Sequence, residues 1–281
     1  MPQPRSILNV FKAYEIRKMK GNTNMNKLKE KLLRGEKALG THIQLNDNIT
    51  TEIIGSLGFD YLWIDTEHTT ISLAQVEQHL LAARSVGVSA IVRVPSNDPI
   101  KIKPILEMGP DGVIIPMVNS YEEAMRAVQS CLYPPRGYRG YGPRRASFYG
   151  TIPMEEYIRN IENNIMRIIQ IEHIDAVRDL KRIVTIDEID AYIIGPMDLS
   201  ASVGKLGQLD DPEVCALFDE IIETIHAAGK PVGVSNGFVP DEIIAEWRDR
   251  GVDMISLASE TDFIINQAKL LMESMKRVML Q

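Results

Sequence analysis

The sequence predicts an α/β protein with a (β/α)8, or TIM, barrel, and three observations support this fold class. Short β-rich runs alternate with amphipathic stretches of helical period from about residue 28 onward. Eight such runs occur, and strands that alternate with helices imply right-handed βαβ units and a parallel sheet. The chain has 281 residues, of which 44% are hydrophobic and 25% charged, as expected for one soluble barrel domain.

The predicted elements follow one another in strand–helix order. Residues 73–87 carry apolar residues at helical spacing and end on Gly87, a residue suited to a C-terminal cap. Residues 121–132 form a second helix pattern, and residues 211–229 begin with Asp-Pro and end on Gly, as helices often do. An open doubly wound sheet is the rival fold, but it normally has fewer strands, and the sequence contains no GxGxxG or Walker motif. The strand candidates are 38–44, 61–65, 89–94, 112–117, 167–172, 191–196, 231–235 and 254–258.

A single barrel domain is expected over residues 28–281, because no linker or low-complexity segment divides them. Residues 1–27 are basic and lack both a contiguous apolar core and a small-residue cleavage site. We therefore expect an appended, poorly ordered N-terminal extension rather than a secretory signal, and a cytoplasmic protein. Two cysteines, Cys131 and Cys215, are too few for a disulfide framework and are expected to be plain thiols.

Charge and hydropathy exclude two classes of partner. The net charge of −7 gives no basic face for non-specific nucleic-acid binding. No apolar run approaches the ~18–20 residues that a membrane-spanning helix needs. The longest stretch without periodicity, residues 133–153, carries four arginines and interleaved tyrosines. These arginines either bind anions or belong to a solvated loop at a subunit contact; they are Arg136, Arg139, Arg144 and Arg145.

Two carboxylates close consecutive strand patterns. Glu172 ends the fifth run, RIIQIE, and Asp198 follows the sixth, AYIIGP. Active sites of TIM barrels lie at the carboxyl ends of the strands, and neighbouring strands are about 5 Å apart, so both acids could converge on one point. Like charges so close repel unless a cation lies between them, and a hard divalent ion such as Mg²⁺ or Mn²⁺ prefers oxygen ligands and water. Alternatively, each acid caps the next helix or pairs with an arginine.

The ends of two further predicted strands carry residues that could take part in catalysis. IDTEHTT supplies Asp65, Glu67 and His68, and a carboxylate beside an imidazole can fix its tautomer and raise its basicity. Arg93 ends the third strand, and an arginine at the barrel mouth suits a carboxylate or an enolate oxygen. The alternatives are that His68 caps a loop and that Arg93 forms a structural ion pair with Asp65 or Glu67.

Six motifs in a fixed order resemble one family. They are GFDYLWIDTEH, VRVPSNDPIKIKPILEMG, VIIPMVNSYEEA, YPPRGYRGYGPRRAS, IQIE and IGPMDLSASVG. Together they resemble the HpcH/HpaI family of metal-dependent (class II) pyruvate aldolases, which includes 4-hydroxy-2-oxoheptanedioate aldolase and 2-dehydro-3-deoxyglucarate aldolase. The resemblance covers residues 28–275. It implies a lyase of aromatic or sugar acid catabolism that uses a divalent cation, Mg²⁺, Mn²⁺ or Co²⁺.

The resemblance also implies roles for residues at the fifth and sixth strands. Glu172 and Asp198 would be the metal ligands that the protein supplies, with water and the 2-oxo acid completing the coordination sphere. Gln170 would bind substrate, and the backbone around Met197 and Asp198 would contact the substrate carboxylate.

The other implied roles concern catalysis and assembly. His68 would be the general base, Arg93 would bind substrate and stabilise the enolate, and Asp65 would orient this machinery. Glu107 stands where relatives often carry aspartate, an acid that tunes the histidine from a neighbouring subunit, and its extra methylene changes its reach. Members of the family assemble as hexamers, so a homo-oligomer (hexamer or trimer) is expected, with the C-terminal helix pattern 263–280 exchanged between subunits.

The expected reaction is reversible cleavage of a 4-hydroxy-2-oxo acid to pyruvate and an aldehyde through a metal-stabilised pyruvate enolate. A Schiff-base aldolase would need a lysine on a barrel strand, and the strand runs contain none. Two rivals remain: an acyl-CoA ester lyase of the citrate lyase β type, and a non-catalytic barrel that binds 2-oxo acids. The sequence does not identify the aldehyde.

Overall fold

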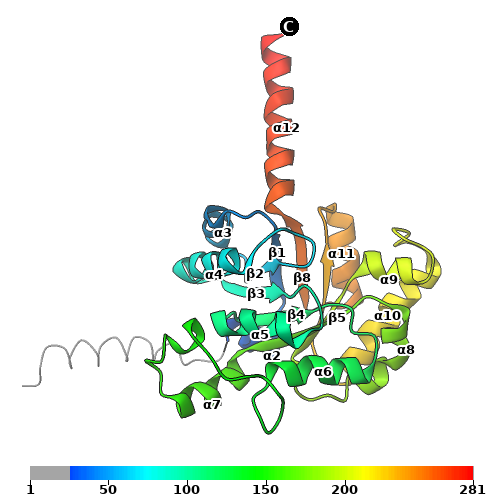
Figure 1. The fold of residues 1–281 in the computed structure, drawn as a ribbon. Helices are drawn as coiled ribbons and strands as arrows, with labels where there is room; N and C mark the ends of the chain where they lie inside the picture. Colours follow the sequence, from blue (N-terminus) through cyan, green and yellow to red (C-terminus); the bar gives the residue numbers. More distant parts are fainter. Residues whose placement is uncertain (1–25, 281) are drawn as a thin grey trace, which may run out of the picture.

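The computed structural model describes residues 26–280 and confirms the predicted barrel. Eight parallel strands, β1 to β8, close the barrel in chain order (Figure 1). Each predicted strand is present, with ends that differ by no more than two residues. Nearly all of the expected N-terminal extension lies outside the described residues. The strands are β1 (Ala38–Ile43), β2 (Tyr61–Asp65), β3 (Ser89–Arg93), β4 (Gly112–Ile115), β5 (Met166–Ile171), β6 (Ala191–Ile194), β7 (Val232–Asn236) and β8 (Met254–Ser259).

The helices form an outer layer around the strands. The predicted helix 73–87 is present with its glycine cap, since Gly87 has a left-handed φ of 76° and Ser72 and Gln75 form a capping box at the other end. The stretch 133–153 contains only a short 3-10 helix (Arg145–Ser147). The α-helices are α2 (Lys27–Leu33), α3 (Asn48–Gly55), α4 (Leu73–Val86), α5 (Pro99–Met108), α6 (Tyr121–Cys131), α7 (Met154–Asn164), α8 (Ile174–Ile183), α9 (Pro196–Ser202), α10 (Pro212–Ala227), α11 (Asp241–Arg250) and α12 (Glu260–Met279).

The barrel interior is filled by side chains from alternate positions of the strands. One buried cluster inside the barrel includes Tyr61, Trp63, Ile91 and Ile168, and Leu28 of α2 joins it at the amino end of the strands. The larger cluster lies between the strands and the helices. Because side chains alternate along a strand, the interior row of each strand continues toward its carboxyl end, which we call the mouth.

At the mouth, the interior rows change from apolar to polar residues. Asp65, Arg93 and Gln170 each stand two positions after an apolar residue of the interior cluster, and His42 of β1 is the register partner of Trp63. All four side chains are buried. Burying polar groups is costly unless they are paired, so this level of the barrel is built for something other than stability.

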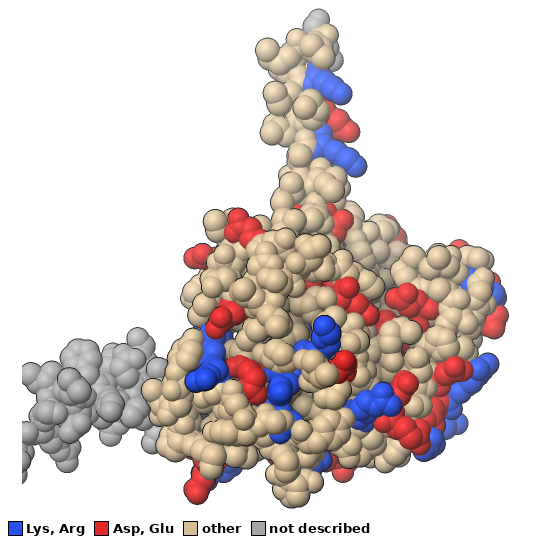
Figure 2. All heavy atoms as spheres, viewed as in Figure 1, with Lys and Arg blue, Asp and Glu red and all other residues tan. Residues whose placement is uncertain are grey.

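Among residues 26–280, no helix covers the outer faces of β1 and β8 at Leu39, Ile255 and Leu257. The helix after β8, α12, extends away from the barrel instead of folding back along it (Figure 1). Leu39 of β1 is 55% exposed, and Ile255 and Leu257 of β8 are only partly buried. The apolar side of α12 is also exposed, and Figure 2 shows its charged residues on one side of the helix.

The helices and the two cysteines were also the subject of predictions from the sequence. Within residues 26–280, none of the helices has the length and apolar character needed to cross a membrane. Cys131 and Cys215 are free thiols, as expected. Burial raises the pKa of the Cys131 thiol to about 11, so this thiol is unreactive at neutral pH.

The barrel interior makes Gly40 a sensitive position. A Cβ atom there would lie 2.3 Å from the Tyr61 ring, which is fully buried and cannot move aside. We predict that Gly40→Ala destabilises the protein by roughly 1–3 kcal/mol, the usual cost of overpacking. Thermal unfolding should therefore occur several degrees lower than in the wild type. The matched control is Gly237→Ala, where an added Cβ has no neighbour within 4 Å; equal midpoints for both variants would contradict this packing.

Candidate active site

Arg93 and Asp65 form a buried ion pair at the mouth. Arg93 Nε donates to Asp65 Oδ1 at 3.0 Å and Nη2 donates to Oδ2 at 2.6 Å. The pair follows from strand register, because Asp65 and Arg93 are direct partners on β2 and β3. Burial acts to raise the pKa of Asp65, but hydrogen bonds and charge from Arg93 outweigh it, so the pKa is lowered and the carboxylate stays ionised.

Glu67 provides a second partner for the same guanidinium. Its Oε2 lies 3.0 Å from Arg93 Nη1. The loop is held by Asp65 Oδ1, which accepts from the backbone N–H of Glu67 at 3.0 Å. The structural ion pair that the sequence left open for Arg93 is therefore present with both acids. Asp65 accepts from two of the five N–H donors of Arg93, and Glu67 Oε2 pairs with Nη1 by charge without a hydrogen bond, so donors remain for a ligand.

His68 lies at the rim of the mouth. Its side chain is 60% exposed, and its Nε2 is 3.7 Å from Glu67 Oε2, which is too long for a hydrogen bond. Asp65 contacts the backbone N–H of His68 at 3.4 Å and not the imidazole. Asp65 thus orients the loop that carries His68, whereas Glu67 is the carboxylate beside the ring.

Glu172 is held in a shaped recess after β5. Its Oε1 accepts from the backbone N–H of Met117 at 2.7 Å, and Gln170 Nε2 donates to its Oε2. Met117 has a φ of 52°, an uncommon conformation for a residue with a side chain, which turns its amide toward the carboxylate. A Cβ at Gly195 would lie 2.9 Å from both Gln170 and Glu172, so only glycine fits there.

Asp198 lies near these acids but on a different element from the one expected. β6 ends at Ile194, and Asp198 is an exposed residue in the first turn of α9. Neither acid caps a helix, since the caps of α8 and α9 are His173 and Gly195. Asp198 is near enough that its charge helps to raise the pKa values of both Glu67 and Glu172.

This region carries more negative than positive charge. Burial, with Glu67 and Asp198 nearby, raises the pKa of Glu172 to about 7. Burial also raises the pKa of Glu67 to about 7, where Asp65 and Asp198 oppose the charge of Arg93. Neighbouring acids with raised pKa values are typical of functional sites, because a cation or a proton is needed to balance them.

The residues present fit a divalent cation. Among residues 26–280, no three His, Cys, Asp or Glu side chains form a complete ligand set. A magnesium site, however, uses one or two carboxylates and fills its remaining positions with water and substrate. Gln170 Oε1 is buried without a hydrogen-bond partner, which leaves a free oxygen acceptor beside Glu172. Glu172 and Asp198 are the candidate ligands.

The remaining predicted residues lie in two places. Met197 is exposed beside Asp198 in the first turn of α9, where backbone N–H groups lack intrahelical partners. Glu107 is in the last turn of α5, which runs back from the mouth, and its Oε1 pairs with Arg139 at 3.1 Å. Within this chain, Glu107 therefore does not join the other site residues.

Sequence reasoning missed several contributors to the site. Met117 acts through its backbone and Gly195 through its missing side chain, and neither role has a local sequence signal. His42 and Trp63 also lie at or just below this level of the barrel, with ring centroids 5.1 Å apart. Their position on the interior row, two residues from other interior residues, was a signal available in the sequence.

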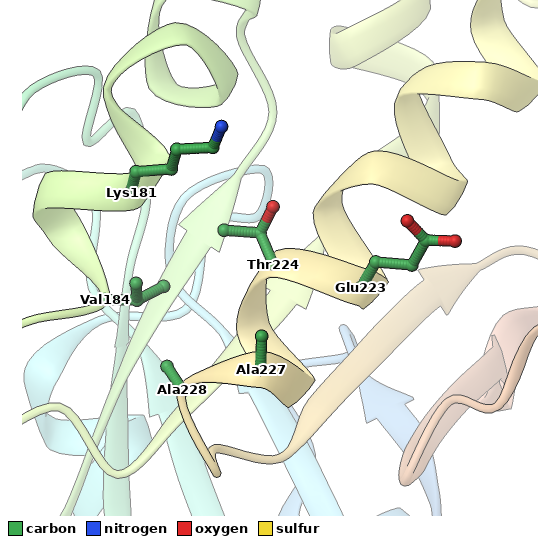
Figure 3. A pocket seen from close by; sticks show the side chains of 6 residues that line it. All are labelled: Lys181, Val184, Glu223, Thr224, Ala227 and Ala228. Carbon is green, nitrogen blue, oxygen red and sulfur yellow. The ribbon is translucent and has the colours of Figure 1, made fainter.

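A groove elsewhere on the molecule has no such chemistry. It lies between α8 and α10 on the outside of the barrel and is lined by small and aliphatic residues with Lys181 and Glu223 at its edges (Figure 3). It contains none of the mouth residues.

Comparisons with known proteins show the family of this chain. The family model described as HpcH/HpaI aldolase/citrate lyase matches residues 39–267. The chain belongs to this family.

Two curated relatives extend the comparison. A pyruvate aldolase of Rhizobium etli is 37% identical over 222 residues, which is 79% of this chain and 85% of the relative. A 5-keto-4-deoxy-D-glucarate aldolase of Enterobacter sp. is 34% identical, covering 90% of this chain and 97% of the relative. The names of these relatives support aldolase activity.

Solved structures of the family share the fold. An HpcH/HpaI aldolase/citrate lyase family protein from Burkholderia cenocepacia superposes with a TM-score of 0.84 at 25% identity, covering 90% of this chain and all of that one. The citrate synthase SbnG gives a TM-score of 0.79 at 27% identity, covering 89% and 98% of the two chains. The family's fold thus accommodates more than one reaction that makes or breaks carbon–carbon bonds.

The raised pKa of Glu172 makes a prediction about stability without metal. A carboxyl group whose pKa rises from 4.5 to about 7 on folding holds its proton more tightly in the folded state. Its stabilising contribution is complete below pH ~4.5 and is lost as the pH rises through ~7. Glu172→Gln, which mimics the protonated form, should therefore be more stable than wild type at pH 8, by at most about 3 kcal/mol, and equal to it near pH 5.

Urea unfolding in a chelating buffer at the two pH values measures this difference. Glu223→Gln, at an exposed carboxylate on the outer groove, is the control and should change little at either pH. A variant Glu172→Gln that is less stable than wild type at pH 8 would contradict the proposed charge imbalance.

Proposed function

We propose that this protein is a metal-dependent class II pyruvate aldolase that reversibly cleaves a 4-hydroxy-2-oxo acid to pyruvate and an aldehyde. The observation that carries the proposal is the barrel mouth, where the buried Glu172 and the partly buried Glu67 interact with each other, with the exposed Asp198 and with the guanidinium of Arg93. Aldolase names among relatives at 34–37% identity support the same reaction class.

Glu172 and Asp198 would hold the cation, which would be Mg²⁺, Mn²⁺ or Co²⁺. When bound, the ion acts as a Lewis acid on the 2-oxo group. Gln170 and the Met117 amide fix the Glu172 carboxylate, so the ligand is held before substrate arrives. Backbone N–H groups at Met197 and Asp198 would receive the substrate carboxylate.

Arg93 would stabilise the negative charge that develops on the 2-oxo oxygen as the bond between carbons 3 and 4 breaks. N–H groups of Arg93 that Asp65 does not use can donate to that oxygen, while Asp65 and Glu67 hold the guanidinium by two hydrogen bonds and an ion pair. A donor fixed in place before reaction needs no rearrangement during it. Removing one such contact typically costs about 3 kcal/mol in barrier height.

His68 would remove the proton of the 4-hydroxyl group, through water. Its exposed imidazole at the rim can exchange protons with solvent, and histidine is the most common general base in enzymes. Glu107 would reach the histidine of a neighbouring subunit. Its Oε2 is buried without a hydrogen-bond partner, so it has acceptor capacity left.

The rival mechanisms have less support. None of the eight strands carries a lysine, which disfavours a Schiff base. For an acyl-CoA lyase, the loop 133–150 would have to supply a basic anchor, but most of its arginines have structural partners. Arg136 pairs with Glu162 and Glu188, Arg139 pairs with Glu107, and Arg145 donates to the Met108 carbonyl. A binding protein without catalysis would not need a buried donor and three acids at one point.

A homo-oligomer with exchanged C-terminal helices completes the proposal. α12 has apolar residues on one side, among them Ile264, Leu271 and Met275, and all three are about half exposed or more. The outer faces of β1 and β8 are uncovered in the same chain, at Leu39, Ile255 and Leu257. A helix from another copy can cover what the chain's own helix leaves open, which buries both apolar surfaces at once.

Site variants test the reaction. Glu172→Ala and Asp198→Ala should lose metal binding and turnover together, whereas Arg93→Ala should keep metal but lose about 10²–10³-fold in turnover. Turnover is measured with pyruvate and a panel of aldehydes, namely succinic semialdehyde, tartronate semialdehyde, glycolaldehyde and acetaldehyde. EDTA should abolish the activity, and Mg²⁺, Mn²⁺ or Co²⁺ should restore it.

The control for these variants is Glu223→Ala, which removes an acid far from the mouth and should leave activity unchanged. The proposal of a metal-dependent aldolase would be refuted if the wild-type protein kept its full rate in EDTA. It would also be refuted if Glu172→Ala, Asp198→Ala and Arg93→Ala all remained active. Turnover of a CoA ester without any aldol product would favour the acyl-CoA lyase.

Assembly is tested with α12. Leu271→Glu places a charge on the apolar side of the helix, whereas Lys269→Glu changes a residue on its charged side. We expect the first variant to have a smaller mass in light scattering than the wild type, and the second to keep the wild-type mass. An identical assembly after Leu271→Glu would contradict helix exchange.

A further inference from the structure

His42 is a buried histidine at the mouth with no role in the proposed reaction. It lies on β1, directly opposite Trp63 in the strand register, and its side chain is 7% exposed. In the closed barrel β1 lies between β8 and β2 and opposite β5, the strand that Glu172 follows. A buried imidazole with no structural partner would be costly, so its contacts indicate what it does.

Both ring nitrogens of His42 have defined partners. Nδ1 lies 2.7 Å from the Ala258 carbonyl, which can only accept, so Nδ1 carries the hydrogen. Nε2 lies 2.9 Å from Ser235 Oγ and accepts from that hydroxyl. Burial lowers the pKa of His42, and the charge of Arg93 lowers it further, so the ring stays neutral. One tautomer and one ring orientation are thereby fixed.

The fixed ring packs on Trp63, and Trp63 in turn carries Arg93. The centroids of the His42 and Trp63 rings are 5.1 Å apart, with the planes tilted by 58°. The guanidinium carbon of Arg93 lies 5.2 Å from the centroid of the Trp63 ring. The Trp63 side chain is fully buried, but its Nε1 has no hydrogen-bond partner, so packing alone sets the position of the indole.

The backbone that receives the His42 hydrogen bond is itself in an unusual conformation. Ala258 has a φ of 54°, which costs on the order of 1 kcal/mol or more for a residue with a side chain. Its carbonyl accepts from both His42 Nδ1 and Thr41 Oγ1, at 2.7 Å and 3.1 Å. Such a conformation persists only where its surroundings fix it, and it gives the imidazole a rigid anchor on β8.

We propose that His42 is a positioning residue of the active site: its imidazole, anchored by Ala258 and Ser235, holds the Trp63 indole in place, and the indole sets where the Arg93 guanidinium meets the substrate oxygen. Asp65 and Glu67 fix the guanidinium from the side of the loop. His42 and Trp63 fix it from inside the barrel. This inference rests on the proposed role of Arg93 as the donor to the 2-oxo oxygen.

The test uses two variants that separate the ring from its hydrogen bonds. His42→Asn can keep a donor toward the Ala258 carbonyl but has no ring to place against Trp63. His42→Phe keeps a ring but loses both hydrogen bonds. The probe is exchange of the C3 protons of pyruvate for deuterium in D2O with Mg²⁺, followed by proton NMR. This reaction requires the enolate but no aldehyde.

We expect His42→Asn to lower the maximal exchange rate by roughly 10- to 100-fold, the cost of misplacing a group that stabilises a transition state. The pyruvate concentration at half-saturation should change less than threefold. His42→Phe should lose less than His42→Asn. In an Arg93→Lys background, His42→Asn should have less than a threefold further effect, because the residue it positions is gone.

Thr41→Val is the matched control, since it removes a hydrogen bond to the same Ala258 carbonyl without touching Trp63. It should keep the wild-type exchange rate, and all variants are compared at equal folded fraction by circular dichroism. A wild-type rate for His42→Asn, or the same loss in the Arg93→Lys background, would overturn the positioning role. Failure of wild-type protein to exchange pyruvate protons would instead refute the proposed function.

Discussion

The site depends on an imbalance of charge at the mouth of the barrel. Four carboxylates, Asp65, Glu67, Glu172 and Asp198, lie at the barrel mouth, and Arg93 is the cation paired with the first two. Arg93 neutralises Asp65. Its single positive charge therefore does not balance the negative charges of Glu67, Glu172 and Asp198. Burial is the main cause of the raised pKa values of Glu67 and Glu172, and the neighbouring carboxylates add to it. A divalent cation would balance the excess negative charge of these carboxylates, and the same cation can activate a 2-oxo acid.

The barrel allows this arrangement because the residues that stabilise the fold lie below the polar residues of the candidate site. Apolar residues fill the interior up to the level of Trp63 and Ile168, and the polar level begins two residues later. Local contacts then fix the positions of the polar side chains. The Met117 amide and the side-chain amide of Gln170 hold Glu172, and the absent side chain of Gly195 leaves room for both. Each of these local features lowers stability, and the large buried apolar clusters below and around them offset that cost.

The sequence was most informative where a single strand determines the outcome. The eight strands, Arg93 at the end of β3 and the shared face of Gln170 and Glu172 all follow from alternation along one strand. It was less informative where two distant segments meet. A structural ion pair of Arg93 with Asp65 or Glu67 was an open alternative, and the sequence did not indicate that Arg93 pairs with both acids. The Met117 amide, the His42 contacts and the outward course of α12 depend on tertiary packing, and helical period alone does not give the direction of a helix.

The central claim is that the acids at the mouth accept a 2-oxo acid only together with a divalent cation. Calorimetric titration with oxalate, a mimic of the pyruvate enolate, tests it most directly because no turnover and no aldehyde are needed. Oxalate should bind wild-type protein in the presence of Mg²⁺ and bind weakly or not at all in EDTA, and Glu172→Gln should lose the binding that depends on Mg²⁺. Equal oxalate affinity with and without the cation would contradict the claim.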